Sequence, residues 1–367
     1  MARTLIWLLL VAVVGCQGAT APSSSAPAAA PPEAADSGRA ASSAAPSSAP
    51  ASPVALRQLR VGYAATNPRV TPLWLAADEG FFQRYGLEVE PVAMRSAPAL
   101  QAAMIAKEIQ IGQSGLPGTL QARAGGADVV QLGGLIDKPL AQLVAHPSIR
   151  RPEDLRGKRL GIQSIGGTVW ARGVLALEKF GLDPDRDNIS LLVIGDEPTL
   201  GQALVAGAID AAPVGATISE PLRQQGYTTW DLAELGVPEI GQAFVTSEAF
   251  VQAEPATVEG FLKGMAEAVA YMKGMPRDPA RREQILGIAA RHLRVAPEDT
   301  ALEIDALVPL IPENLLPERA AMETIYTLSA RENPDVARVS LDSALDERIL
   351  RRLEAEGYFR QLYANSR

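Results

Sequence analysis

The chain has 367 residues, of which 47% are apolar, and a formal net charge of −8 at pH 7. This length accommodates two ordinary domains with appendages, and the apolar fraction is sufficient for buried cores. No block of lysine and arginine stands out, which argues against nucleic acid as a partner. The chain has a single cysteine, so no disulfide can form within one copy.

The N-terminal sixteen residues have the pattern of a targeting segment. Arg3 supplies a positive charge, residues 5–14 form an apolar run too short to span a bilayer, and Cys16 follows Val-Val-Gly. This pattern resembles the lipobox of bacterial lipoproteins, and a chance cysteine after a signal peptide is the alternative. We therefore expect residues 1–16 to be a lipoprotein signal peptide, with Cys16 as the lipidation site of a membrane-anchored extracytoplasmic protein.

Residues 17–55 are almost all alanine, serine, proline and glycine, with few side chains large enough to pack. Such a composition predicts a disordered linker between the lipid anchor and the folded part of the chain.

The first folded segment alternates strands and helices. We predict a strand at 59–64, a loop at 65–68, and a helix from Thr71 whose apolar residues recur at helical spacing up to Phe81. Gly86 ends this unit, and a partly exposed strand follows at 87–91.

A second helix and a short strand complete this unit. We predict the helix after residues 95–96 and the strand at 109–111, and the loop Gln113-Ser114-Gly115 follows that strand. Further strands are predicted at 129–132 and 140–145.

Residues 152–155 begin the second folded segment. We predict a strand at 160–162, the small-residue loop 164–168, and a helix to Phe180 that Gly181 terminates. A loop between a strand and a helix presents free backbone N–H groups at the positive end of the helix dipole. Because its hydroxyls and glycines allow close approach, this loop is typical of a site for a small polar or anionic group.

The strongest internal signal is a repeat. Residues 98–115 align without gaps on residues 198–215, with identical residues at six of the eighteen positions, among them Pro98/Pro198 and Gly115/Gly215. Convergence on a generic helix-to-strand turn is the alternative. The ordered recurrence of strand, loop, helix, helix and strand favours two similar α/β lobes. In the second lobe we predict strands at 191–194 and 209–214.

The chain is predicted to return to the first lobe at residues 242–246 and to be helical from Pro255 onward. One apolar stripe runs from Val258 to Met272, and another from Leu345 to Leu353. We expect these C-terminal helices to pack over the first lobe and to carry no chemistry.

Four loops are expected to face one cleft, because ligands of open α/β sheets bind beyond the carboxyl ends of the strands. The candidate ligand-binding residues are Thr66, Asn67, Gln113, Ser114, Gly115, Ser164, Gly166, Gly167, Thr168, Gly215, Thr217, Trp74 and Trp170. Each serine or threonine could instead be a helix N-cap, and the two tryptophans could instead be core residues. Arg95 could pair with an anion or lie solvated on the surface.

Four segments resemble the substrate-binding proteins of ABC transporters in the nitrate, sulfonate, taurine and thiamine-precursor group (the SsuA/THI5-like family). They are PLWLAADEGFFQRYGLEVE, AAMIAKEIQIGQSG, RRPEDLRGKRLGIQSIGG and LVAGAIDAAPVG. The resemblance covers about residues 57–330. It implies an α/β, periplasmic binding protein type II-like fold, in which two lobes joined by two crossovers close on a ligand by hinge motion.

The resemblance also implies a domain layout and partners. We expect a first lobe at 56–148, a second lobe at 149–244, and a return to the first lobe with C-terminal helices at 245–367. The implied partners are a small-molecule ligand, a membrane permease and its ATPase. We expect a monomer without cofactor. One departure is Gln110, where the family usually has the aspartate that Asp210 keeps, and we interpret that aspartate as a structural turn former.

Catalysis has little support in the residues. The two histidines, His146 and His292, are far apart in the sequence and form no metal cluster with cysteine, and no P-loop motif occurs. We therefore expect a binding protein and not an enzyme. Two alternatives stay open, a sensor lipoprotein that feeds a membrane receptor and a relative of the thiamine pyrimidine synthase. The latter family uses a cysteine-rich motif and an active-site histidine. We expect the ligand to be a small anionic or heterocyclic metabolite, such as a sulfonate, nitrate or a thiamine precursor.

Overall fold

The computed structural model describes residues 55–64 and 66–365, which belong to one compact unit. The expected signal peptide with Cys16, and the expected linker up to residue 54, lie outside the described residues. Of the helices in the described ranges, none combines the length and the apolar character needed to cross a membrane.

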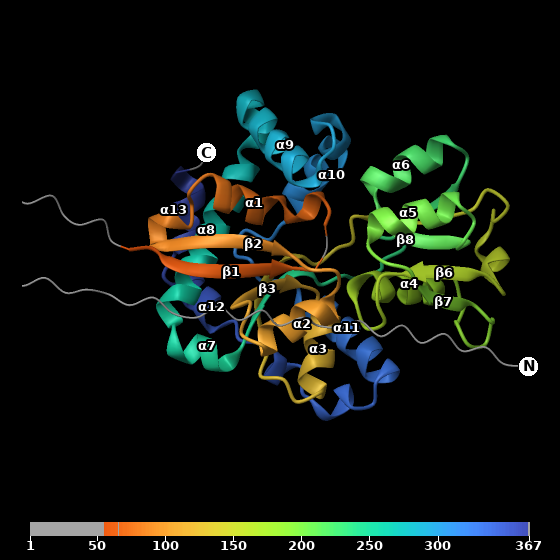
Figure 1. Ribbon diagram of the computed structural model, residues 1–367, viewed down its shortest axis with the longest axis horizontal. Coiled ribbons are helices and arrows are strands. Elements are labelled where there is room, and N and C mark those ends of the chain that lie inside the picture. Colours follow the sequence, from red (N-terminus) through yellow and green to blue (C-terminus); the bar gives the residue numbers. More distant parts are fainter. Residues whose placement is uncertain (1–54, 65, 366–367) are drawn as a thin grey trace, which may run out of the picture. The chain divides into compact units, whose positions relative to one another are not determined.

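Two five-stranded sheets organise the unit (Figure 1). The first sheet has the order β2-β1-β3-β10-β4, and its strands are β1 Arg57–Tyr63, β2 Leu87–Ala93, β3 Ile111–Ser114, β4 Val130–Ile136 and β10 Gly241–Thr246. The second has the order β7-β6-β8-β5-β9, and its strands are β5 Ala141–Ala145, β6 Arg159–Ile162, β7 Ser190–Val193, β8 Ala211–Gly215 and β9 Thr228–Asp231.

The two sheets have the same topology. In the first, β1 pairs in parallel with β2 and β3, and β10 runs antiparallel to β3 and β4. In the second, β6 pairs in parallel with β7 and β8, and β5 runs antiparallel to β8 and β9. The chain thus crosses between the sheets twice, at residues 137–140 and 232–240. The predicted return at 242–246 is confirmed by β10.

Two expected boundaries are wrong. The second lobe was expected to extend to residue 244, but that position lies inside β10 of the first sheet. The strand predicted at 140–145 was expected in the first lobe (56–148), but β5 pairs with β8 and β9 in the second sheet. A local pattern identifies a strand without identifying its partner, because pairing of an antiparallel strand is decided by tertiary packing. The first crossover therefore lies before residue 141.

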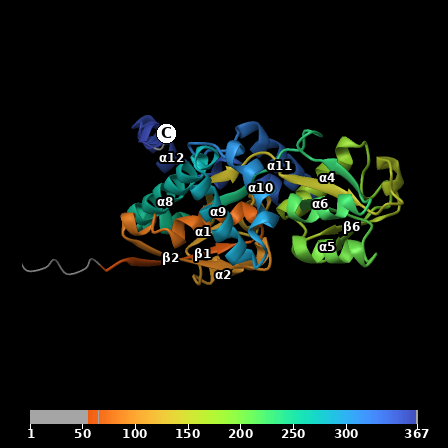
Figure 2. The same cartoon turned by 90° about the horizontal axis from the view of Figure 1, so that it is seen from above.

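Helices cover both sheets (Figures 1 and 2). Those that precede the return to the first sheet are α1 Thr71–Asp78, α2 Ala97–Ile105, α3 Leu116–Ala124, α4 Thr168–Lys179, α5 Glu197–Val205 and α6 Ala216–Gln224. Those that follow it are α7 Glu248–Ala253, α8 Pro255–Lys273, α9 Pro279–Leu293, α10 Pro297–Leu310, α11 Arg319–Glu332, α12 Arg348–Ala355 and α13 Tyr358–Asn365.

The repeat extends to the packing of each lobe. Gly62 lies in β1 and Gly161 in β6, each beneath a buried leucine of the second α-helix that follows the strand, α2 and α5 respectively. A Cβ atom at Gly62 would lie 2.9 Å from Leu100 Cδ1, and one at Gly161 would lie 2.8 Å from Leu200 Cδ2. Both leucines are fully buried. In each lobe, a strand glycine therefore leaves room for the corresponding leucine, Leu100 or Leu200.

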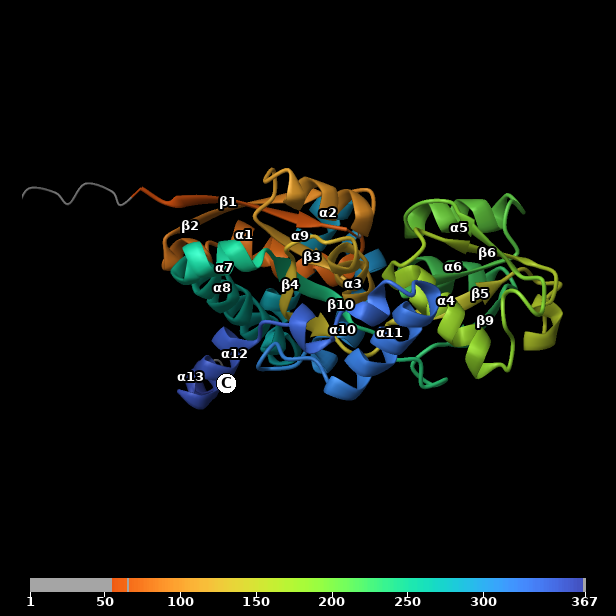
Figure 3. The same ribbon diagram turned by 90° about the horizontal axis from the view of Figure 1, so that it is seen from below.

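The C-terminal helices do more than cover the first lobe. Helix α10 contacts both α6 of the second lobe and the short 3₁₀ helix Pro68–Val70 of the first, and α11 contacts α3 (Figure 3). Met322 and Ile325 of α11 belong to the same buried cluster as Trp170. Helices α8 and α9 contact α1 of the first lobe, as expected, whereas α10 and α11 also contact residues of the second lobe.

Candidate functional site

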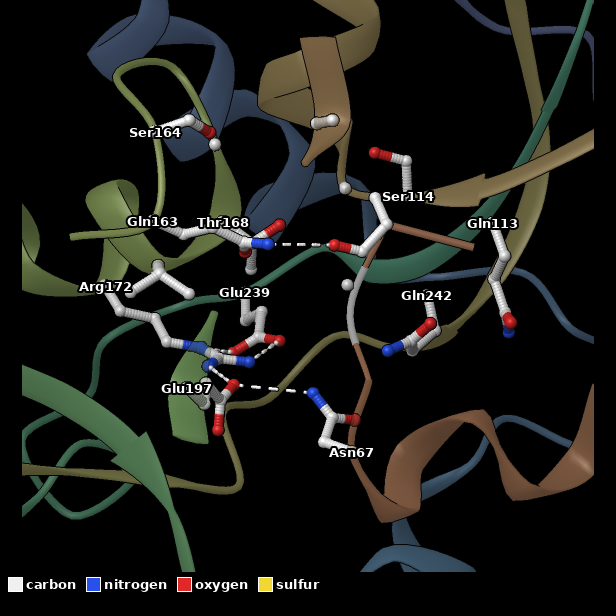
Figure 4. A pocket seen from close by; sticks show the side chains of 16 residues that line it. Asn67, Gln113, Ser114, Gln163, Ser164, Thr168, Arg172, Glu197, Glu239 and Gln242 are labelled. Carbon is white, nitrogen blue, oxygen red and sulfur yellow. Dashed lines mark hydrogen bonds and ion pairs between the residues drawn. The ribbon is translucent and has the colours of Figure 1, made fainter. Parts of the chain in front are cut away.

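A small cavity lies where the strand ends of the two sheets meet, with residues of both lobes in its lining (Figure 4). Its volume is about 40 Å³. A cavity needs about 10–15 Å³ of volume on this measure to hold one water molecule. Seven of the sequence-predicted residues line it: Asn67, Gln113, Ser114, Gly115, Ser164, Gly167 and Thr168. The loops therefore face one another around this cavity.

Two residues that line the cavity have buried polar side chains with no hydrogen-bond partner in the described part of the chain. Gln113 is 1% exposed and Ser114 is 5% exposed. Neither amide atom of Gln113, nor the Ser114 hydroxyl, has a hydrogen-bond partner within residues 55–64 and 66–365. Buried polar side chains in folded proteins are nearly always satisfied, and the exceptions call for a functional explanation. These two side chains can hydrogen-bond a molecule placed in the cavity.

Three helices begin at the site with glycine N-caps. Gly115, Gly167 and Gly215 precede α3, α4 and α6, and none of these helix starts has a side-chain cap. The alternative that Ser164 or Thr168 is an N-cap is therefore wrong. Asn67 differs, since its side chain accepts from Arg69 N at the start of the 3₁₀ helix. At the start of α3, Leu116 N donates to the Ile240 carbonyl oxygen at 3.1 Å and Pro117 has no N–H, whereas the first-turn N–H groups of α4 have no competing side chain.

The lobes touch each other around the cavity. A Cβ atom on Gly115 would overlap Thr168 Oγ1 of the second lobe and would lie 3.0 Å from the Ile240 carbonyl oxygen. Gln163 of the second lobe donates its amide to the carbonyl oxygens of Ala64 and Arg95 of the first, each at 3.0 Å. This close fit requires glycine at position 115.

A network of buried ions forms the other wall of the site. Arg172 of α4 donates two hydrogen bonds to Glu239, at 2.6 and 2.7 Å, and a third to Glu197 at 3.0 Å. Arg69 of the first lobe also pairs with Glu197, and its Nε lies 3.3 Å from Glu303 Oε1 of α10. All five side chains are at least nine-tenths buried. The network joins both lobes, the second crossover and a C-terminal helix.

The environment moves the carboxyl pKa values of this network apart. Burial alone would raise the pKa of Glu197, but the charges of Arg69 and Arg172 outweigh it and hold that pKa below its ordinary value. Burial raises the pKa of Glu303, and the nearby Glu197 charge adds to the shift against the opposing effect of Arg69. The carboxylate of Glu197 is therefore the ionised centre of the network, which two guanidinium groups compensate.

Six predicted residues do not line the cavity. Gly215 and Thr217 bind the ion network instead, since Gly215 N donates to Glu197 and Thr217 Oγ1 donates to Glu303. Gly166 has a φ of +71° and approaches Gln121 of α3. Thr66 is half-buried outside the lining.

The remaining two, Trp74 and Trp170, are fully buried in separate core clusters, which is the alternative role that the sequence left open. Trp74 stacks on His292, with 4.8 Å between the ring centroids. Arg95 is exposed and does not line the cavity.

Sequence reasoning missed five polar residues of the lining: Gln163, Arg172, Glu197, Glu239 and Gln242. Gln163 directly precedes the predicted loop, and Arg172 is a charge on the apolar face of its helix, a signal that could have been used. Gln242 has a φ of +51°, a strained conformation that concentrates at functional sites but leaves no mark in the sequence. Glu239 gives no local signal.

Neither histidine lines the cavity. His146 contacts Ser148, and His292 contacts Asp78. Within the described part of the chain, no three His, Cys, Asp or Glu side chains are grouped so that they could hold a metal ion.

A family model described as NMT1/THI5 like matches residues 67–278. Among curated proteins, the 4-amino-5-hydroxymethyl-2-methylpyrimidine phosphate synthase of Candida albicans is 21% identical over 229 residues, which cover 58% of this chain. A Haemophilus influenzae protein, whose name assigns it provisionally to thiamine biosynthesis, is 26% identical over 223 residues, which also cover 58% of this chain. The chain spans 66% and 68% of the lengths of these two relatives.

Solved structures share the fold. The periplasmic aliphatic sulphonate binding protein SsuA of Escherichia coli has a TM-score of 0.63 and 22% identity, covering 80% of this chain and 99% of that one. The periplasmic nitrate-binding protein NrtA of Synechocystis has a TM-score of 0.60 and 15% identity, covering 82% and 89%. A structure from Bordetella bronchiseptica reaches 0.68 at 20% identity, covering 82% and 97%. These likenesses establish the periplasmic binding protein fold, which was expected from the sequence.

Proposed function

Since the chain belongs to the NMT1/THI5-like family, we propose that it is the solute-binding component of an ABC importer, which captures a small metabolite between its lobes. The observation that carries this proposal is the pair of buried, unpartnered side chains, Gln113 and Ser114, in a cavity lined by both lobes. Each such group costs free energy when buried without a hydrogen bond, so a solute that bonds to it in the cavity recovers that cost.

The proposed capture works by hinge motion. The crossovers at 137–140 and 232–240 connect the two sheets, and each can absorb a rotation of one lobe against the other. Solute enters between separated lobes and bonds to Ser114 and Gln113 on one side and to the α4 start on the other. Closure then brings Gly115 against Thr168 and excludes water. The lobe bounds of this proposal are those of the sheets, with the first crossover before residue 141.

The solute that we propose is a small anionic or heterocyclic metabolite of the sulfonate, nitrate or thiamine-precursor type. Uncapped helix starts favour an acceptor or an anion. The named ligands of the similar solved proteins are sulfonate and nitrate, and the curated relatives are named for a pyrimidine. The permease and its ATPase are the partners proposed with this role, and the protein acts as a monomer.

The proposed anchor is a lipid on Cys16, which places the domain on the outer face of a membrane. This part of the proposal rests on the sequence pattern alone. A Cys16→Ser variant should leave the membrane fraction and appear in the soluble one. Retention of that variant in the membrane fraction would contradict the lipid anchor.

A second candidate function has one observation in its favour, namely that several curated relatives are named as pyrimidine phosphate synthases. The cavity offers amides, hydroxyls, an arginine and two glutamates, and both histidines lie elsewhere. We therefore propose binding without turnover. An assay for formation of the pyrimidine phosphate named for these relatives separates an enzyme from a binding protein.

A thermal-shift screen of residues 53–367 tests the proposed function. The compounds are alkanesulfonates, nitrate, pyrimidines and flavins, and a ligand at a hundred times its dissociation constant stabilises the folded state by about 2.7 kcal/mol. We expect one class to raise the melting temperature by several degrees and the others to leave it unchanged. A melting temperature that no class moves would contradict a solute-binding role for this cavity.

A further inference from the structure

The two lobes present corresponding corners to the site. Residues 97–126 and 197–226 carry the same elements at a constant offset of one hundred: α2 and α5, β3 and β8, α3 and α6. Both α3 and α6 begin at an extended glycine without a side-chain cap. Both repeats end at a left-handed glycine, Gly126 with a φ of +86° and Gly226 with a φ of +89°. Each residue of one corner can therefore be compared with a definite residue of the other.

In the second lobe, this corner holds the protein's own carboxylates. Gly215 N, at the start of α6, donates to Glu197 Oε2 at 2.8 Å. Thr217 Oγ1, in the first turn, donates to Glu303 Oε2 at 3.1 Å. A helix start accommodates a buried carboxylate because its free N–H groups and dipole stabilise negative charge. In the second corner, the α6 start therefore holds a carboxylate together with the Arg69 and Arg172 guanidinium groups.

In the first lobe, the residue that corresponds to Glu197 is Ala97. It lines the cavity and supplies no carboxylate to the start of α3. A Cβ atom on Gly118, in the first turn of α3, would lie 3.0 Å from Ala97 Cβ and 3.5 Å from Ser114 Oγ. Ala97, Ser114 and the start of α3 therefore share one corner of the cavity.

The neighbouring side chains also make the first corner the one that is open to a ligand. Where the second lobe has Pro213 and Val214, the first has Gln113 and Ser114. The Ser114 hydroxyl is buried and has no partner among the residues that the structure describes, and the same holds for the amide of Gln113. The first corner thus lacks a protein carboxylate and adds hydrogen-bonding groups that nothing in the described chain satisfies.

We infer that the solute supplies the acidic group that Ala97 lacks. This group is a carboxylate or sulfonate oxyanion, which binds at the start of α3 and accepts hydrogen bonds from Gly115 N–H and Ser114 Oγ. Glu197 blocks the corresponding corner of the second lobe, so the acidic end of the solute binds to the first lobe only. Ala97 is accordingly a specificity-determining residue, because its short side chain leaves the corner to the solute. This inference rests on the proposed function and assigns the orientation of the solute.

A substitution that introduces a carboxylate at position 97 tests this assignment without any solute. The variant Ala97→Glu places the Glu197 side chain of the second lobe at the corresponding position of the first, and Ala97→Gln is its neutral control of equal size. Thermal unfolding of both variants of residues 53–367, a unit with its own hydrophobic cores, is measured from pH 7 downward. We expect A97E to melt about 2 °C or more above A97Q at pH 7, as a charge stabilised at a helix start would.

The pH dependence of the melting temperature shows whether the added carboxylate stabilises the fold in its ionised form. A carboxylate held at the start of α3 has a lowered pKa in the folded protein, so its contribution is present above the unfolded pKa and disappears as pH falls through the folded one. The gap between A97E and A97Q should therefore close at low pH. Equal melting of the two variants at pH 7, lower melting of A97E, or failure of A97E alone to fold would each overturn the assignment.

A second measurement covers the case in which both variants are too bulky to fold. Sodium acetate, compared with chloride at equal ionic strength, should raise the melting temperature of the unmodified protein more than that of Ser114→Ala. Equal shifts would overturn the assignment. Neither experiment uses the natural solute, so a negative result in them does not affect the thermal-shift screen that tests the proposed function. If the screen finds no ligand but A97E melts above A97Q, only the importer function is overturned.

Discussion

Gln110 and Asp210 occupy corresponding positions of the two lobes and perform one task with different chemistry. Gln110 Oε1 accepts a hydrogen bond from Arg60 N at 2.9 Å, and Asp210 Oδ2 accepts one from Arg159 N at 2.8 Å. Asp210 also binds the Arg159 guanidinium. The interpretation of this position as structural is confirmed, and the departure from the family pattern at Gln110 leaves the local turn intact.

The ion pair at Asp210 predicts a pH dependence of stability. The hydrogen bond from the Arg159 side chain is the main cause that lowers the pKa of Asp210 to about 2. Because the folded pKa lies below the unfolded value of about 4, ionised Asp210 stabilises the fold above pH 4, and this contribution is lost as pH falls toward 2.

The variant Asp210→Asn reproduces the chemistry of Gln110 and should lack this dependence. Urea unfolding between pH 5 and pH 2 (about the range of the two pKa values) measures it. We expect the free energy of unfolding to decrease more steeply with falling pH for the unmodified protein than for D210N. Parallel curves for the two proteins would show that the Arg159 pair does not stabilise the fold.

At the scale of elements, the repeat could be predicted from the sequence because both copies keep the residues that the packing needs. Leu100 and Leu200, and Ile109 and Ile209, are buried in both lobes at the same offset. The strand-loop-helix order then places the loops at one edge of each sheet. This reasoning predicts Gln113, Ser114 and Thr168 as residues of the site.

The charged wall of the site could not be predicted, because its members come from elements that meet only in the folded chain. Glu303 lies in α10, a helix that the sequence placed over the first lobe, and Glu239 lies in a crossover without a motif. Glu197 opens α5, where a first-turn glutamate is ordinary helix chemistry. Each of these residues has an unremarkable local explanation, and only the tertiary structure brings them to Arg172.

The loop before α4 gives a prediction at this scale. Gly167 is the N-cap of α4 and the helix start has no side-chain cap, so removal of the Ser164 and Thr168 hydroxyls should leave the helix intact. We expect the double variant Ser164→Ala, Thr168→Ala to weaken solute binding while the melting temperature without solute changes little. Calorimetric titration and thermal unfolding measure the two quantities. A large loss of stability with unchanged affinity would show that the hydroxyls support the fold.

At the scale of the whole molecule, closure depends on contacts that cross between the lobes. Arg69 of the first lobe pairs with Glu197 of the second, and Gln163 of the second donates to two carbonyl groups of the first. Breaking a buried ion pair typically costs roughly 3–5 kcal/mol, because it leaves a charge uncompensated. Opening must therefore replace these contacts with water, and a bound solute adds the contacts that favour the closed state.

The cavity that both lobes line makes this account testable, because the account places the solute there. The most direct measurement is a crystal structure of residues 53–367 grown with the compound that gives the largest thermal shift. The account predicts that the compound lies between the lobes, bonded to Ser114 and Gln113 of the first and to the start of α4 in the second. A compound bound outside this cavity, or in contact with one lobe only, would contradict it.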